Sequence, residues 1–282
     1  MTHGAGIVRT ARRPPGWRAP GPPPATPPDR PDLWPRAGED LCWLSGDWRI
    51  LQRVGGHRWS LDDLVTAWFA AREVAAAPPV RLVDLGCGIG TVLLLLGWRF
   101  PTTRGAGIEA QAVSVELARR SIAWNGADDR LAVRHGDLRD PAALSDVGPV
   151  ELVTGTPPYL RPGTATESAR EQWGPCHVEH RGGIEAYAAA AARLLAPGAP
   201  FVACEQTAQW ERVAVAAARA GLGVARRMDV VPRDGKAALF SVFALRAGAT
   251  APCVEPPLVV RDRAGRRTAA FTAIRAEMGL PP

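Results

Sequence analysis

The chain has 282 residues and a formal net charge of +6, with 34 Lys and Arg against 28 Asp and Glu. This length suits one large α/β domain. The longest apolar stretches are too short for a membrane span, and the N-terminus lacks the apolar core of a signal peptide, so we expect a cytoplasmic protein without a membrane partner. Its five cysteines include no C-x-x-C pair, which argues against a disulfide framework or a cysteine-based zinc site.

The first segment, residues 1–38, is rich in Pro and Arg. Between 14 and 35 it is dense in Pro and has neither helical nor strand periodicity, which is typical of a disordered or polyproline-like leader. Six arginines against two aspartates in residues 1–36 contribute a charge of +4, which leaves only +2 for the remainder. We therefore predict a separable, disordered leader on a nearly balanced folded part.

Residues 39–247 alternate short apolar runs with alanine-rich stretches, the pattern of β-α units around a parallel sheet. Residues 48–59 predict a hairpin turning at Gly55 and Gly56, and Ser60 followed by two aspartates predicts a helix start. Strands are then expected at 81–85, 105–109, 131–134, 151–155, 201–205, 222–230 and 238–245, and helices at 90–100, 112–124, 183–195 and 208–220. The sequence thus predicts an α/β fold with a central, mostly parallel sheet of about seven strands and helices on both faces.

The C-terminal segment, residues 248–282, reads as a basic extension. It contains a cluster of arginines that could form a phosphate-binding stripe or simply a solvated face, and we favour the solvated face. The cluster consists of Arg261, Arg263, Arg266 and Arg267.

The strongest motif runs from Asp84 through Gly86, Gly88 and Gly90, between a predicted strand and a predicted helix. Such a loop lets the backbone approach a ligand closely, and the helix start offers free N–H groups and a positive dipole to a carboxylate. Glu109 ends the next predicted strand, at a distance along the chain where a carboxylate can accept hydrogen bonds from ribose hydroxyls.

A dinucleotide site is the main rival, but Thr91 stands where its third glycine would fall. The spacing instead resembles the first motif of class I S-adenosylmethionine-dependent methyltransferases. That resemblance implies a Rossmann-like fold and S-adenosyl-L-methionine as cofactor. It assigns Asp84 and the glycine loop to the methionine end, Glu109 to the ribose, and Asp137, with Leu138 beside it, to the adenine. For Asp137 a plain turn or cap remains an alternative.

A second motif, Thr156-Pro157-Pro158-Tyr159, follows the predicted strand 151–155, on the side of the sheet where α/β ligand sites lie. Two prolines stiffen the turn, and the Tyr159 ring could stack on a planar substrate. The segment resembles the Asn-Pro-Pro-Tyr motif of amino-group methyltransferases. The order of motifs over about residues 45–245 is similar to that of the bacterial tRNA adenine-N6 methyltransferase group.

The resemblance implies transfer to an exocyclic amine, adenine N6 in tRNA or other RNA, with Thr156, Pro157 and Tyr159 in the catalytic site. Thr156 replaces the family's asparagine, and its hydroxyl has less reach than an amide. A protein glutamine amide or a small molecule therefore stays open as acceptor, and so does a non-catalytic cofactor-binding module.

The segment from Cys176 to His180 contains sulfur and nitrogen ligands, but its spacing does not match a closed zinc site, so we predict no metal. His180 and Arg181 either line the acceptor side of the pocket or face solvent in a loop.

Overall fold

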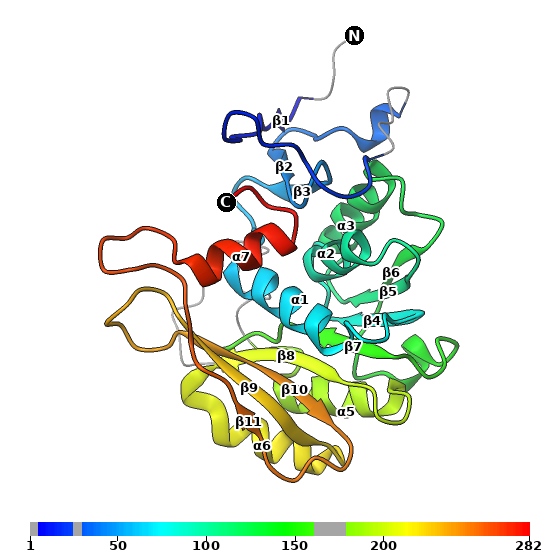
Figure 1. The fold of residues 1–282 in the computed structure, drawn as a ribbon. Helices are drawn as coiled ribbons and strands as arrows, with labels where there is room; N and C mark the ends of the chain where they lie inside the picture. Colours follow the sequence, from blue (N-terminus) through cyan, green and yellow to red (C-terminus); the bar gives the residue numbers. More distant parts are fainter. Residues whose placement is uncertain (1–4, 25–29, 161–178) are drawn as a thin grey trace.

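The structure is a computed structural model that describes residues 5–24, 30–160 and 179–282. Within these ranges the centre is a nine-stranded sheet of order β11-β9-β10-β8-β7-β4-β5-β6, with β12 also paired to β9 (Figure 1). In this sheet β10 alone runs antiparallel to its neighbours. The strands are β4 (Arg81–Leu85), β5 (Arg104–Glu109), β6 (Leu131–His135), β7 (Leu152–Gly155), β8 (Phe201–Gln206), β9 (Gly223–Val231), β10 (Phe240–Arg246), β11 (Cys253–Val254) and β12 (Leu258–Val259).

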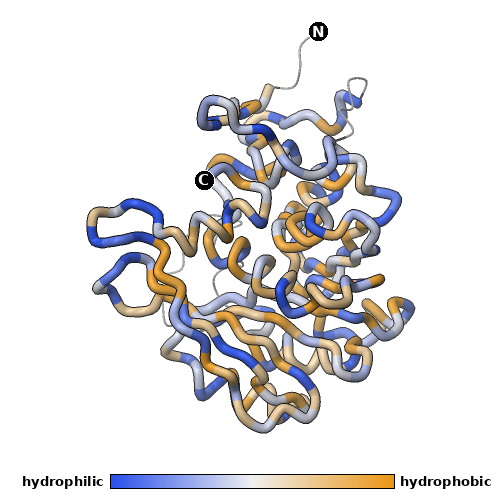
Figure 2. Tube along the Cα trace, in the orientation of Figure 1, coloured by the Kyte–Doolittle hydropathy of each residue, from blue (hydrophilic) through white to orange (hydrophobic). Residues whose placement is uncertain are grey.

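Helices cover both faces of the sheet. On one face lie α1 (Leu61–Glu73), α2 (Thr91–Arg99), α3 (Ala112–Trp124) and α7 (Ala269–Glu277), and on the other lie α5 (Ile184–Leu194) and α6 (Trp210–Arg219). Successive strand residues point to opposite faces, so Leu82 joins one hydrophobic core and Val83 the other. The sheet therefore lies between two hydrophobic cores, and Figure 2 shows that the central strands consist largely of hydrophobic residues.

The predicted fold class is confirmed: the sheet is mostly parallel, and every predicted strand and helix from residue 60 to 245 is present within a few residues of its expected bounds. The predicted hairpin is wrong in register. It consists of β2 (Glu39–Trp43) and β3 (Arg49–Arg53), and the chain turns through residues 44–48 instead of at Gly55 and Gly56. Gly46 takes a positive φ of 54° in that turn. The sequence contains a more prominent glycine pair at positions 55 and 56, and the prediction placed the turn there instead.

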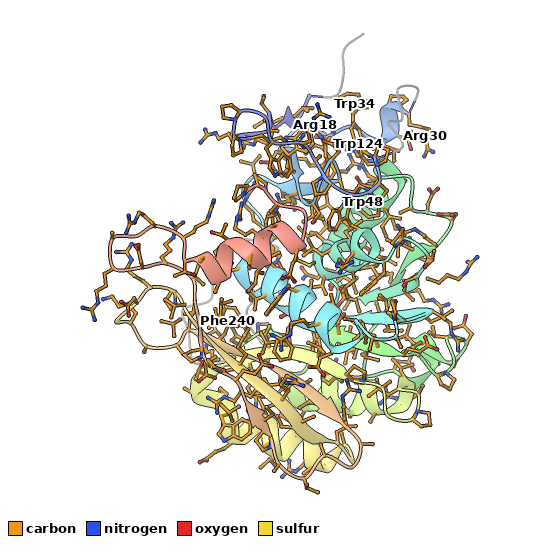
Figure 3. All side chains as sticks on the ribbon, viewed as in Figure 1. Arg18, Arg30, Trp34, Trp48, Trp124 and Phe240 are labelled. Carbon is orange, nitrogen blue, oxygen red and sulfur yellow. The ribbon has the colours of Figure 1, made fainter. Side chains whose placement is uncertain are left out.

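The N-terminal segment differs from the predicted disordered leader in its described residues. β1 (Ile7–Val8) adds to β2 as a parallel strand, Leu33 is only 3% exposed, and Trp34 packs edge-on against Trp124 with ring centroids 5.0 Å apart (Figure 3). Arg9 also donates to the fully buried carboxylate of Asp40 at 2.9 Å. Isolated apolar residues between prolines form no periodic pattern, so sequence periodicity could not report this burial.

The C-terminal segment belongs to the same fold and is not a separate extension. β11 and β12 extend the sheet beyond β9. α7 buries Phe271 and Ile274, and Trp68 in α1 donates to Glu277 at 2.7 Å. Among the residues that the structure describes, no helix is long and apolar enough to cross a lipid bilayer.

Candidate functional site

A cavity of about 340 Å³ opens at the carboxyl ends of the parallel strands β4, β5 and β7. This edge is where ligands bind in open α/β sheets. Its walls come from the glycine loop after β4, the ends of β5 and β6, the loop after β7, the first turn of α1 and residues near the start of α5. Segments far apart in the sequence therefore meet at one site.

The glycine loop forms the floor of this cavity. Gly86 and Gly88 line it with φ angles of +58° and +54°, a backbone region that side chains rarely adopt. A Cβ atom on Gly86 would lie 2.0 Å from the Tyr187 hydroxyl, whereas a Cβ on Gly88 would meet no atom within 4 Å. Gly88 thus faces open cavity, and Gly86 is required because Tyr187 packs against it.

Two predicted loop residues, Asp84 and Gly90, are not among the residues that line the cavity. Gly90 precedes α2 with φ +85°, and a Cβ there would lie 3.2 Å from Ala118 Cβ, so it allows α2 and α3 to pack closely. Asp84 is 2% exposed and accepts a hydrogen bond from the Thr154 hydroxyl at 2.8 Å. Burial raises the pKa of Asp84 to about 7. Asp84 and Gly90 therefore stabilise the glycine loop without lining the cavity.

Glu109 lines the cavity at the end of β5 and binds the glycine loop directly. Its Oε2 accepts from the Gly88 N–H at 3.0 Å and its Oε1 from the Gln111 N–H at 2.7 Å. Burial raises its pKa, and these backbone donors oppose the rise. Each carboxylate oxygen retains a second lone pair, so Glu109 can hold the loop and still accept from a ligand hydroxyl.

Asp137 and Leu138 follow β6 and line the same cavity. The Asp137 carboxylate accepts hydrogen bonds from Arg139 through Nε and Nη2, and Arg139 lowers the pKa of Asp137. A ligand that uses Asp137 must share it with this arginine.

The predicted transfer loop lies across the cavity from the glycine loop. Thr156, Pro157 and Tyr159 all line the cavity, at the carboxyl end of β7. The Thr156 hydroxyl forms no hydrogen bond with the described residues, so its donor and acceptor are available to a ligand. The Tyr159 hydroxyl lies 3.2 Å from Asp62 Oδ2 and 3.0 Å from the Cys204 sulfur, so protein groups already engage this hydroxyl.

The first turn of α1 forms a wall that sequence reasoning treated only as a helix start. Ser60, Asp62 and Asp63 line the cavity, and Ser60 and Asp63 form a capping box in which the Ser60 N–H donates to Asp63 Oδ2 at 3.0 Å. Burial, and then the charge of Asp62, raise the pKa of Asp63 well above its usual range. The pattern Ser-x-Asp-Asp predicted the helix cap, but nothing in this pattern indicated that these residues line a cavity.

Tyr187 is the second residue that sequence reasoning missed. It comes from α5, lines the cavity and is 6% exposed. A Cβ on Gly155 would lie 2.7 Å from its ring, so Tyr187 fits between two strand ends that carry glycine. The chain has only two tyrosines, and both line this cavity. The rarity of tyrosine is the one feature of the sequence that could have drawn attention to Tyr187.

Arg181 lines the cavity although its side chain is exposed, whereas His180 is exposed and is not among the lining residues. The pocket interpretation therefore holds for Arg181, and the solvent interpretation holds for His180. Cys176 and His177 lie outside the described residues. Within the described ranges, no group of three or more His, Cys, Asp or Glu side chains is placed to hold a metal ion.

Comparison with known proteins gives relatives over part of the chain. A stretch of 100 residues is 33% identical to a tRNA1(Val) (adenine(37)-N6)-methyltransferase of Porphyromonas gingivalis, covering 35% of this chain and 39% of that protein. A stretch of 119 residues is 33% identical to a release factor glutamine methyltransferase of Caulobacter vibrioides, covering 41% of this chain and 39% of that protein. The chain thus spans about two fifths of the length of these relatives. No protein-family model matches it.

A solved structure gives broader coverage. A protein from Agrobacterium tumefaciens described as a predicted O-methyltransferase aligns with a TM-score of 0.60 at 18% identity, covering 78% of this chain and 98% of that one. This likeness confirms the Rossmann-like methyltransferase fold. The relatives confirm the resemblance to methyltransferases of the tRNA adenine-N6 group that the motifs indicated.

Proposed function

We propose that the protein is an S-adenosylmethionine-dependent methyltransferase that acts in the cytoplasm on an exocyclic amino group, adenine N6 in tRNA or other RNA. The observation that carries this proposal is the meeting of two loops at one cavity: the glycine loop at Gly86 and Gly88, and the loop from Thr156 to Tyr159. A cofactor loop and a transfer loop that face each other are the minimum that methyl transfer needs, because the reaction depends on placing the two reactants in line.

The cofactor side fits S-adenosylmethionine in size and chemistry. The cavity volume lies within the ordinary range for ligand pockets, and Gly88 leaves open space beside the backbone. Thr91, in the first turn of α2, lines the cavity. The positive end of the α2 dipole therefore lies at the cavity, where it would attract a ligand carboxylate. When bound, the cofactor supplies a methyl group already activated on a positively charged sulfonium.

The remaining assignments on the cofactor side concern its polar groups. Glu109 would accept from ribose hydroxyls while it fixes the Gly88 loop, and Asp137 with Leu138 would hold the adenine. Asp84 and Gly90 would act indirectly, because they shape the loop without lining the cavity.

On the acceptor side, the Thr156 hydroxyl and the Pro157 carbonyl would accept the two hydrogens of an amine. This would turn the nitrogen lone pair toward the methyl carbon, and the Tyr159 ring would stack on the acceptor. No strong base is required, because the leaving group is activated before transfer. The role of these residues is to orient the acceptor.

A protein glutamine amide is the second candidate acceptor. Thr156 in place of asparagine leaves this acceptor open, and the partial identity to a release factor glutamine methyltransferase favours it. A small-molecule acceptor and a non-catalytic cofactor-binding module are the remaining alternatives.

Methyl-labelled S-adenosylmethionine distinguishes these candidates. The protein is incubated with separate pools of tRNA, ribosomal RNA, DNA and protein from cells that lack its gene, and label is counted in each pool. We expect label in tRNA and its loss with Thr156→Ala. Label in the protein pool alone would replace RNA with the glutamine amide, and label in no pool would favour a small-molecule acceptor or the non-catalytic module.

A further inference from the structure

Two loops separated in the sequence by β10, β11 and β12 fold together into one strongly basic projection. The segment 231–239 starts at the last residue of β9 and leads to β10, and residues 260–268 connect β12 to α7. In Figure 1 both loops project from the same end of the sheet, and Figure 2 shows hydrophilic residues along each of them. We call these two segments the basic arm.

The arm is held by its own backbone. The Asp234 N–H donates to the Arg261 carbonyl at 2.8 Å, and the Val260 N–H donates to the Val231 carbonyl at 2.9 Å. A bridge between Arg261 and Arg267 then closes the second loop. The side chains of the arm are therefore presented from a fixed scaffold, which lowers the entropy lost when they bind a partner.

The positive charge of the arm is not explained by the high arginine content of the chain as a whole. Six basic residues stand against Asp234 and Asp262, which gives the arm a formal charge of +4. Residues 1–36 also carry +4, so the rest of the chain must carry −2 to reach the total of +6. The basic residues of the arm are Arg233, Lys236, Arg261, Arg263, Arg266 and Arg267, and Lys236 is the only lysine in the sequence.

These cations are exposed and weakly compensated. Arg263 and Arg266 pair with Asp234 and Asp262, but their side chains are 83% and 81% exposed, and ion pairs this exposed contribute little. Arg233, Lys236 and Arg261 are exposed and form no ion pair with side chains of the described residues. A polyanion could therefore engage them without displacing a stronger partner.

The neighbourhood of Arg275 supports this concentration of positive charge. Burial, and after it the charges of Arg267 and Arg261, together lower the pKa of Arg275 to about 10.

The arm stands at the same edge of the sheet as the cavity. Gln206 lines the cavity at the end of β8, and its register partner across the sheet is Phe240, the first residue of β10. β9 ends at the same edge, with Val230 opposite Phe240. The 231–239 loop thus begins two strands away from β8, which carries this cavity residue, and ends one strand away from it. Phe240 lies at the base of the arm in Figure 3.

From this juxtaposition we propose that the basic arm is a binding surface for the sugar-phosphate backbone of an RNA acceptor, which it holds while one nucleotide enters the cavity. The inference rests on the proposed function and deepens it. A rigid cationic projection beside a pocket suits a polymer with regularly spaced negative charges better than a neutral small molecule, because each neutralised phosphate releases counterions.

The test uses the full chain and unfractionated tRNA. The variant R233Q/K236Q/R261Q removes three arm charges, and R233Q/K236Q removes two side chains that have no hydrogen bond within the described structure. The matched control R99Q/R104Q/R219Q removes three exposed arginines at the opposite edge, where α2 and α6 end and β5 begins. Thermal melting with and without S-adenosylmethionine checks that each variant folds and retains its cofactor site.

Binding is measured between about 50 and 200 mM salt, where phosphate contacts change affinity most visibly. We expect the triple arm variant to weaken tRNA binding at least about tenfold. The slope of log Kd against log salt should fall by about 2, at roughly 0.7–0.9 per lost phosphate contact, and the double variant should fall between wild type and triple variant. The control should stay close to wild type. Arm variants that bind tRNA as the control does, or wild-type protein that binds poly-L-glutamate as tightly as tRNA, would overturn the proposal.

Methyl transfer on the same preparations separates the two claims. If the wild type methylates tRNA but binding is insensitive to the arm, the arm proposal fails and the proposed function stands. If tRNA binds through the arm while label enters only protein, the arm is supported as an RNA-binding surface and the proposed acceptor fails.

Discussion

The Tyr159 hydroxyl donates a hydrogen bond to Asp62 Oδ2 at 3.2 Å, which ties the loop after β7 to the first turn of α1. Two walls of the cavity that are almost a hundred residues apart in sequence are thereby joined. Because this bond occupies the hydroxyl, we expect Tyr159 to meet an acceptor through its ring.

Tyr159→Phe and Tyr159→Ala should separate these two roles. The phenylalanine variant keeps the ring and loses one hydrogen bond, so we expect a stability loss of about 1 kcal/mol and an acceptor KM close to wild type. The alanine variant also loses the stacking face, worth roughly 1–3 kcal/mol for a base, so its acceptor KM should rise about tenfold or more. Steady-state kinetics on the labelled acceptor checks this, and equal KM values for both variants would show that the ring does not contact the acceptor.

Gly88→Val should abolish stabilisation by the cofactor. Gly88 faces open cavity, so a valine side chain would occupy ligand space. Gly221→Val is the matched control, because Gly221 has φ +73°, also meets no atom within 4 Å, and does not line the cavity. Both variants place a side chain at a positive φ, so both should melt earlier than wild type. In thermal melting, S-adenosylmethionine should raise the melting temperature of wild type and Gly221→Val alone, because only a ligand of the native state stabilises by mass action. NAD should raise none of the three, and a shift retained by Gly88→Val would contradict the loop assignment.

The sequence allowed prediction where local patterns decide the structure. The strand before Asp84, the glycine loop and the helix after it are consecutive, so periodicity and glycine spacing were enough to indicate them. Tyr187 could not be predicted in this way, because its place depends on α5 packing against a loop about a hundred residues earlier. Leu33 was missed for the same kind of reason: its burial is set by tertiary contacts and leaves no repeat in the sequence.

Two buried carboxyl groups should make the protein more stable in mild acid than in mild base. Burial raises the pKa of Asp84 to about 7 and that of Glu205 to about 7. Asp84 Oδ2 and Glu205 Oε2 have no hydrogen-bond partner among the described residues, so ionisation is uncompensated there. The folded state therefore keeps protons that the unfolded chain has already lost, and the free energy of unfolding falls as the pH rises from about 5 through 7.

The double variant D84N/E205Q isolates this effect. One pKa unit corresponds to about 1.4 kcal/mol, so wild type should lose on the order of a few kcal/mol between about pH 5 and pH 8, and the variant clearly less. Chemical denaturation at several pH values measures both. The exposed Glu211→Gln serves as control and should follow wild type. Parallel pH profiles for wild type and D84N/E205Q would show that these carboxyls do not carry the dependence.

The N-terminal segment should contribute to stability. Arg9→Ala removes a donor from the buried Asp40 carboxylate, which would then rely on Arg58 alone. We expect a loss of about 1 kcal/mol, or about 2–4 °C in melting temperature. Arg12→Ala is the control, because Arg12 is exposed and pairs with no described side chain. Sequence reasoning alone predicts that deletion of residues 1–36 leaves the melting temperature nearly unchanged, whereas the structure predicts a clear drop.

The final prediction concerns Thr156, which stands where the Asn-Pro-Pro-Tyr motif that this loop resembles has asparagine. Thr156 lines the cavity with a hydroxyl that no described residue engages, so its removal should affect the acceptor and leave the fold and the cofactor site intact. If it orients an amine in the transition state, Thr156→Ala should lower kcat/KM by about 10²–10³, or less where water can substitute, without changing cofactor affinity.

Thr156→Ser is the conservative control, because it keeps the hydroxyl at the same distance from the backbone and should retain most of the turnover. Thr156→Asn introduces the longer amide of the Asn-Pro-Pro-Tyr motif. It should favour an adenine acceptor if the native acceptor is adenine, and impair transfer if the cavity is adapted to a different amine that sits deeper. Single-turnover rates with saturating cofactor compare the four proteins at the chemical step. Full turnover by Thr156→Ala on the true acceptor would remove the Thr-Pro-Pro-Tyr loop from the mechanism, and the defensible function would then shrink to a cofactor-binding domain with its transfer site elsewhere.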